Sequence, residues 1–128
     1  MKATELQIGD YIKYQGQIYI VEEISAKGWV HLIYPETKVR VNMTSDYIID
    51  LLEPIPLTRE ILELNGFKYF KEISSYVLQT ETIPIILRWD YWFKRFYWHE
   101  VKIRNVHELQ HVLRMCDMNE RANNFKVE

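Results

Sequence analysis

The run His107-Glu108-Leu109-Gln110-His111 matches the H-E-x-x-H pattern of zinc hydrolases. Two histidines four residues apart lie on one face of a helix, where they can share a Zn²⁺. The glutamate between them can then activate a metal-bound water. On this hypothesis the chain is a zinc-dependent hydrolase, with His107 and His111 as metal ligands.

The position of the motif argues against that hypothesis. An apolar stripe at helical spacing defines the buried side of the expected helix, and it consists of Leu109, Val112, Leu113 and Cys116. At about 100° per residue, His107 and His111 project almost opposite to this stripe. We therefore expect both histidines to face water.

The rest of a catalytic zinc site is also missing from the sequence. Such a site needs a third protein ligand, and the 17 residues after His111 offer only Asp117, Glu120 and the terminal Glu128. Glu108 has a structural task instead, as the capping-box partner of Asn105. We expect no enzyme activity, no catalytic residue and no metal.

A second stretch with chemical potential, residues 88–104, holds seven of the 18 aromatic residues. It also carries five cations against Asp90 and Glu100, a local charge of +3 in a chain of −2. Cations between aromatic rings are typical of proteins that bind single-stranded nucleic acid, because each stacked base contributes about 1–3 kcal/mol. The same residues are equally suited to buried strands.

Strand alternation suggests which of these side chains are exposed. If residues 95–103 form one strand with Val101 and Ile103 inward, alternate residues lie on the outer face. In the preceding strand Ile85 and Leu87 point inward, which places Arg88 outward. The candidate partner-binding residues are Arg88, Phe96, Trp98, Lys102 and Arg104. Their face could pack against the core or a second copy, bind a protein partner, or bind nucleic acid.

The overall composition limits these alternatives. The chain has 128 residues, 48% of them hydrophobic, with 16 Lys and Arg against 18 Asp and Glu. Its pI of about 6.1 excludes a whole-chain polyanion binder, for which a pI above about 9 is expected. No apolar run reaches the about 20 residues of a membrane span, and the N-terminus lacks a signal-peptide pattern. We expect a cytoplasmic protein that does not contact membranes.

Two further features argue against familiar chemistry. Cys116 is the single cysteine, so it forms no internal disulfide, and we expect it to be a buried small apolar residue. The four glycines do not cluster into a phosphate-binding loop. We therefore expect no cofactor.

The first part of the chain reads as short strands joined by short turns. We expect strands at 11–14, 17–24, 29–34, 38–42 and 47–51, whose connections are too short for parallel crossovers. This pattern predicts an SH3-like small antiparallel β-barrel over residues 1–53. Its expected interior consists of Ile12, Ile18, Ile20, Ile24, Val30, Leu32, Val39 and Val41.

The second part combines helices and strands. Residues 54–57 contain two prolines, which disfavour a central strand, and we expect this segment to be a linker. Residues 58–128 then form an α+β module with an antiparallel sheet and two helices, one over 59–65 and one from Asn105 to about Asp117. The helix over 59–65 has Thr58 as N-cap and Gly66 as its left-handed end. Three or four strands are expected, roughly at 68–73, 76–79, 83–89 and 95–103, with an edge strand at 125–127 after a polar tail.

Three segments of the chain also resemble a known group of proteins. They are Met1–Ile12, Pro54–Phe67 and Val106–Gln110. In combination they are similar to small uncharacterised proteins of Bacteroidetes phages, prophages and other mobile elements, in which Asn stands at the position of His111. The resemblance implies a context and no activity. We therefore expect a non-catalytic interaction protein of a mobile element that binds a protein partner or itself, with zinc hydrolysis and single-stranded nucleic acid binding as alternatives.

Overall fold

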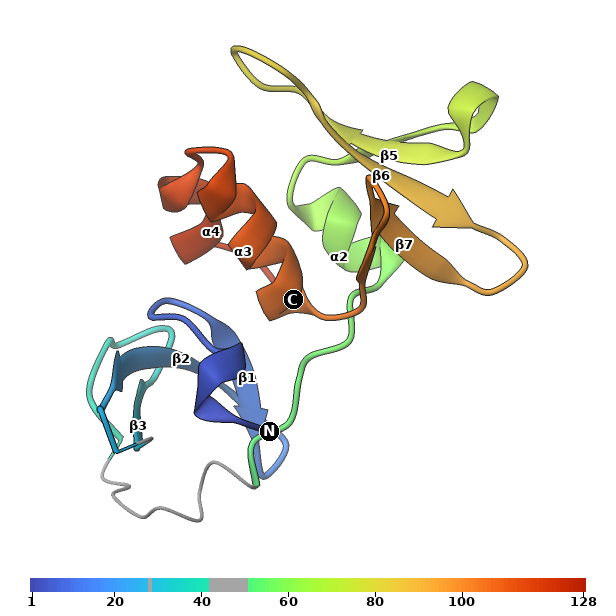
Figure 1. Cartoon of the computed structure of the whole chain (residues 1–128). Coiled ribbons are helices and arrows are strands. Elements are labelled where there is room, and N and C mark those ends of the chain that lie inside the picture. The colour runs from blue at the N-terminus through green and yellow to red at the C-terminus, as the bar shows by residue number, and fades with distance from the viewer. Residues whose placement is uncertain (28, 42–50) are drawn as a thin grey trace. The chain divides into compact units, whose positions relative to one another are not determined.

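The computed structural model describes residues 1–27, 29–41 and 51–128 of the chain (Figure 1). The fold is α+β, as predicted, with one three-stranded and one five-stranded antiparallel sheet. The chain divides into two compact units. The first unit comprises residues 1–55 and 106–124, and the second comprises residues 56–105 and 125–128. The C-terminal helices thus belong to the same unit as the N-terminal sheet, a grouping that differs from the expected division at residues 54–57.

The sheet of the first unit is a meander of three strands. It contains β1 (Tyr11–Tyr14), β2 (Gln17–Ile24) and β3 (Val30–Ile33) in sequential order, after a short 3-10 turn η1 (Ala3–Glu5). The expected bounds of the first two strands are confirmed. Gln15 and Gly16 form the tight turn between them, with φ of 49° and 79°.

No closed barrel is found among the residues that the structure describes. In the expected strand 38–42, only Arg40 forms an isolated bridge, with Ile33. Asn42 and residues 47–50 of the fifth expected strand lie outside the described residues. The SH3-like barrel therefore stays a prediction.

The core of the first unit differs from the expected one along β2. Tyr19 and Val21 enter the core, whereas Ile20 is buried outside this core cluster and pairs with Tyr11. A β-bulge between Val21 and Glu23 then shifts the alternation, so that Ile24 packs against the same core as Val21. Four expected core residues are confirmed, namely Ile12, Val30, Leu32 and Val41.

Other expected core residues lie nearer the surface. Ile18 and Ile24 are only partly buried. Val39 is 58% exposed, so its assignment to the interior was wrong. Its segment forms only the single bridge at Arg40 and therefore has no continuous strand alternation to turn Val39 inward.

Two helices complete the first unit. They are α3 (Val106–Met115) and α4 (Asn119–Asn123), which lie side by side in Figure 1. The expected apolar stripe is buried at Leu109, Val112 and Leu113. Cys116 is exposed because α3 ends one residue before it, so its expected burial was wrong. The expected polar tail instead contains α4, whose Ala122 is fully buried.

The helix of the second unit, α2 (Arg59–Leu64), forms as predicted. Thr58 accepts a hydrogen bond from the backbone N–H of Ile61 at 3.2 Å. Gly66 has φ of 90° and Phe67 N–H donates to Leu62 O, which ends the helix in the predicted left-handed turn.

Five strands in sequential order form the sheet of the second unit, namely β4 (Lys68–Phe70), β5 (Ser75–Leu78), β6 (Ile85–Asp90), β7 (Arg95–Trp98) and β8 (Val101–Ile103). The 3-10 turn η2 (Lys71–Ile73) ends the first of the expected strands early. A two-residue turn at His99 and Glu100 divides the expected strand 95–103 into β7 and β8, and His99 there has φ of 55°. Only three or four strands were expected because this turn was not recognised.

The proline segment is held by backbone hydrogen bonds. Within the first unit, Val106 N–H donates to Ile55 O at 2.8 Å, and within the second unit Leu57 N–H donates to Arg104 O at 3.0 Å. Ile55 and Leu57 are both buried. The segment expected to be a linker is thus part of both packed units.

The end of the chain forms no strand at 125–127, contrary to expectation. The Asn65 side chain takes the role of a pairing strand, since it donates to Lys126 O at 2.7 Å and accepts from Lys126 N–H at 2.8 Å. Phe125, which precedes Lys126 in the sequence, is buried.

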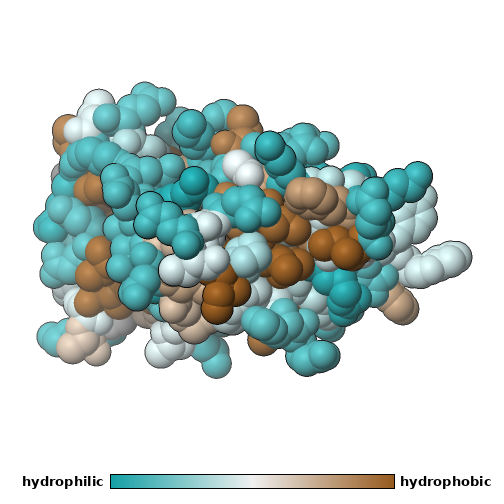
Figure 2. Space-filling view, turned by 90° about the horizontal axis from the view of Figure 1, so that it is seen from above, coloured by the Kyte–Doolittle hydropathy of each residue, from teal (hydrophilic) through white to brown (hydrophobic). Residues whose placement is uncertain are grey.

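The face shown in Figure 2 is largely hydrophilic, with apolar areas interrupted by polar side chains. Within the described ranges, no helix is long and apolar enough to cross a membrane.

Candidate functional site

The two histidines of the H-E-x-x-H motif lie inside the first unit. His107 is only 4% exposed, and the side chain of His111 is 23% exposed. The expectation that both face water was wrong. The apolar stripe is buried on one side of α3. On the other side, Asp10 of the loop before β1 contacts His111 and Arg114, so this side is also partly covered.

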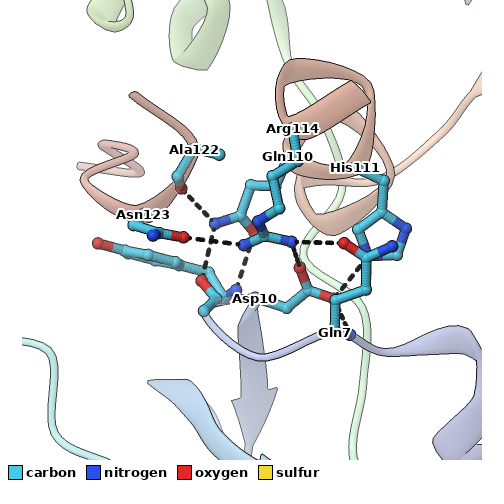
Figure 3. A network of polar contacts seen from close by, with 9 residues as sticks. Gln7, Asp10, Gln110, His111, Arg114, Ala122 and Asn123 are labelled. Carbon is cyan, nitrogen blue, oxygen red and sulfur yellow. Dashed lines mark hydrogen bonds and ion pairs between the residues drawn. The ribbon is translucent and has the colours of Figure 1, made fainter. Parts of the chain in front are cut away.

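Asp10 is the centre of a polar network between that loop and α3 (Figure 3). Its carboxylate is fully buried, and Oδ1 lies 2.6 Å from Arg114 Nη1 while Oδ2 lies 2.7 Å from His111 Nε2. Oδ2 also accepts the backbone N–H of Gln7 at 2.7 Å. Both carboxylate oxygens are therefore engaged, which offsets the cost of burying the charge.

Gln110 forms the second half of this network. Its fully buried amide donates to Gly9 O at 3.0 Å and to Ala122 O at 2.7 Å, and its Oε1 accepts Tyr11 N–H at 2.9 Å. One side chain of α3 thus satisfies backbone groups of the loop, of β1 and of α4. Gln110 and His111 of the motif therefore hold α3 to neighbouring segments of the first unit.

His107 has a buried ring nitrogen without a hydrogen-bond partner among the described residues. Its Nδ1 is buried and has no partner within the described structure. Burial lowers its pKa below the ordinary range, and nearby His111 adds to this effect, while Asp10, Glu108 and Glu5 oppose it.

Among the described residues, the two motif histidines have no third metal-ligating side chain placed to hold a metal ion with them. The His107 and His111 rings are 5.7 Å apart between centroids, and His111 Nε2 already pairs with Asp10. Across residues 1–27, 29–41 and 51–128, no group of three His, Cys, Asp or Glu side chains is placed to hold a metal ion. The arrangement forms a buried ion pair that fastens α3.

A separate pocket of about 350 Å³ lies within the second unit. Five of its lining residues are cations and one, Glu60, is an anion. The cations are Arg59, Lys94, Arg95, Lys102 and Arg104, and the other lining residues are Leu57, Thr58, Trp89, Phe96 and Ile103. The pocket therefore combines a strong excess of positive charge with aromatic rings.

Arg59 is fixed in this pocket by aromatic side chains. Its Nε donates a hydrogen bond to the Tyr76 hydroxyl, which raises the pKa of Arg59 and keeps it cationic. The guanidinium also lies 5.7–5.8 Å from the ring centroids of Tyr69, Tyr76 and Trp89. These contacts come from three strands and α2, so the cation is held in place before any ligand binds.

The predicted partner-binding residues divide into two groups. Phe96, Lys102 and Arg104 line the pocket, whereas Arg88 and Trp98 do not. Arg88 instead lies over the Tyr97 ring, 4.4 Å from its centroid, in a cross-strand pair.

The predicted outward orientation of Phe96 was wrong, since it is 4% exposed and pairs with the buried Ile103. The turn at residues 99–100 reverses the chain. Paired residues on adjacent strands share a face, whereas residues seven apart on one continuous strand do not.

Three exposed aromatic residues, which precede two pocket residues in the sequence, were not predicted as a site. Tyr91, Trp92 and Phe93 are 76%, 88% and 68% exposed, in the loop between β6 and β7. We call them the aromatic tip. Asp90, which precedes the tip, is a residue typical of turns and was the sequence signal for a hairpin here. Lys94 and Arg95 were counted among the cations of residues 88–104 but not among the candidate binding residues. Arg59 was missed because only the tertiary structure brings α2 to the sheet.

No family model matches the chain, and neither the curated proteins nor the solved structures contain a significant match. The resemblance to mobile-element proteins therefore stays a prediction.

Proposed function

We propose that this chain is a non-catalytic interaction protein whose second unit binds the phosphate backbone of nucleic acid in the cationic pocket. The observation that supports the proposal is the lining of that pocket, which includes five cations, one anion and the aromatic residues Trp89 and Phe96. Arginine and lysine side chains bind phosphates, and nearby rings accept bases by stacking.

The distribution of charge supports the same partner. The second unit has nine Lys and Arg against seven Asp and Glu, a net charge of +2, while the first unit has seven against 11, a net charge of −4. A polyanion is therefore attracted to the second unit and repelled by the first. The bulk charge of −2 hides this difference.

Binding without catalysis is the simplest reading of the lining. Its charged groups are five cations and Glu60, a composition that suits the binding of an anion. Phosphate binding needs only the fixed positive charge.

The test removes two flexible pocket cations. A Lys94→Gln and Lys102→Gln double variant should bind a short fluorescent oligonucleotide about tenfold more weakly than the unmodified protein, measured by anisotropy. The slope of log affinity against log salt should fall by about 1.4, which is about 0.7 for each lost phosphate contact on a single strand.

The matched control is Lys68→Gln with Lys71→Gln, which removes the same charge from the same unit at exposed residues outside the pocket. This control should retain most of the affinity. Equal loss in both double variants, or unchanged binding in the pocket variant, would contradict the proposal. Oligonucleotide binding that is absent in the unmodified protein would favour a protein partner instead.

A further inference from the structure

We propose that the aromatic tip, Tyr91 to Phe93, stacks on unpaired bases and so makes the neighbouring pocket selective for single-stranded nucleic acid. This inference rests on the proposed function and specifies its ligand.

The three aromatic side chains of the tip are largely exposed to solvent. Trp92 is 88% exposed, and the rings on either side of it are 76% and 68% exposed. Figure 1 shows that the loop carrying them extends beyond the end of β6 and β7. Most large aromatic side chains bury their rings, so three consecutive exposed rings point to a ligand that covers them.

The loop that carries the tip is ordered by its own contacts. Asp90 Oδ1 accepts the backbone N–H groups of Trp92 and Phe93 at 3.0 and 3.1 Å. The guanidinium of Arg95 lies 5.8 Å from the centroid of the Phe93 ring. A loop already held in one conformation loses less entropy when a ligand binds.

The tip lies between residues of the cationic pocket in the sequence. Trp89 stands two residues before the tip, and Lys94 and Arg95 follow Phe93 directly. Trp89, Lys94 and Arg95 all line the pocket. A strand whose phosphates occupy the pocket therefore places its bases within reach of the tip. The five cations that line the pocket favour a polyanion such as nucleic acid over an apolar partner, which would leave their charges unpaired.

The chemistry of stacking determines the form of nucleic acid. In a duplex the faces of the bases are covered by neighbouring base pairs, whereas an unpaired base presents a free face to an aromatic ring. Backbone contacts alone do not distinguish the two forms. The tip thus converts a general phosphate site into one for unpaired strands.

The test compares oligonucleotides with and without bases. The unmodified protein should bind a base-bearing single strand about tenfold more tightly than an abasic strand of the same length and than the matching duplex. In a Trp92→Ala and Phe93→Ala double variant, affinity for the base-bearing strand should fall about tenfold, while affinity for the abasic strand stays unchanged.

The control is Ile83→Ala, which truncates a side chain that is 82% exposed in another loop of the same unit. It should bind like the unmodified protein. Because the tip residues are exposed, their replacement should leave the unfolding curve unchanged, which confirms that the double variant is folded.

The results separate the two proposals. If the pocket variant loses affinity but the tip variant does not, the stacking inference is wrong and phosphate binding holds. If the pocket variant also binds normally, both are wrong. Tight duplex binding would overturn the inference, and so would Trp92-dependent binding to phosphatidylserine vesicles, or Trp92-dependent self-association in sedimentation, with no effect of the tip variant on oligonucleotides.

Discussion

Asp10 and His111 are 101 residues apart in the sequence, yet Asp10 Oδ2 lies 2.7 Å from His111 Nε2. With Arg114 on the other carboxylate oxygen, this contact fastens α3 to the loop before β1. A histidine that resembles a zinc ligand in the sequence is thus a partner of a buried carboxylate.

Replacement of Asp10 by Asn should lower the free energy of unfolding by about 3 kcal/mol, because it leaves Arg114 and His111 without the anion that pairs with them. Urea denaturation measures this loss. The control Glu22→Gln removes an exposed partner of Arg40 and should cost less than about 1 kcal/mol. Similar losses of unfolding free energy in the two variants would show that the buried carboxylate contributes no more to stability than an exposed one.

Replacement of Gln110 by Leu should lower the free energy of unfolding by about 3 kcal/mol, since two backbone carbonyls and the Tyr11 N–H lose their buried partner. The matched control is Gln79→Leu at an exposed position. Stability within about 0.5 kcal/mol of the unmodified protein is expected for an exposed replacement. The same small effect at Gln110 would contradict its structural role.

The stability of the first unit should depend on pH through His107. Because burial lowers the pKa of His107 in the folded state, the unfolded chain binds a proton first as the pH falls below about 6.5. Stability is therefore fully present above that pH and is lost, by at most about 1.4 kcal/mol per pH unit, until the folded state also binds the proton. Denaturation of the unmodified protein and of His107→Leu should give curves that diverge in this range, with the flatter one for His107→Leu. Equal slopes would contradict the assignment.

Two glycines with positive φ allow a test of close packing around the network. An added Cβ at Gly9 would lie 2.5 Å from Asn123 Oδ1 and 2.9 Å from Arg114 Nη2, whereas at Gly16 it meets nothing within 4 Å. Gly16→Ala should cost about 1 kcal/mol from the backbone alone, and Gly9→Ala clearly more. Combining Gly9→Ala with Asn123→Ala should recover part of the difference in thermal unfolding. Equal costs at the two glycines would refute the close contact.

Order in the aromatic tip should contribute to binding. Asp90→Ala removes the acceptor of the Trp92 and Phe93 N–H groups, so the loop should become less ordered and affinity for a single-stranded oligonucleotide should fall about threefold. Anisotropy measures the affinity, and Asp117→Ala, an exposed acidic residue of the first unit, controls for the lost charge. If both variants bound the oligonucleotide as tightly as the unmodified protein or more tightly, the order of the loop would not contribute to affinity.

Local signals in the sequence predicted several elements well. The Thr58 cap and Gly66 define α2, and the Gln15-Gly16 turn defines the β1–β2 hairpin, because each depends on residues only a few positions apart. Predictions that counted alternate residues over longer stretches failed. A bulge between Val21 and Glu23 and the turn at His99 each shifted the alternation, and neither has a strong local signal.

The sequence by itself determined the α+β class, the main hairpin, the capped helix and the concentration of aromatic and basic residues in 88–104. Only the tertiary structure decided which of those residues act together. It buries His107 and pairs His111 with Asp10, and it brings Arg59 of α2 to the cations of β7 and β8. The physical reason is that burial and charge pairing depend on contacts between distant segments, whereas the sequence pattern reports only neighbours along the chain.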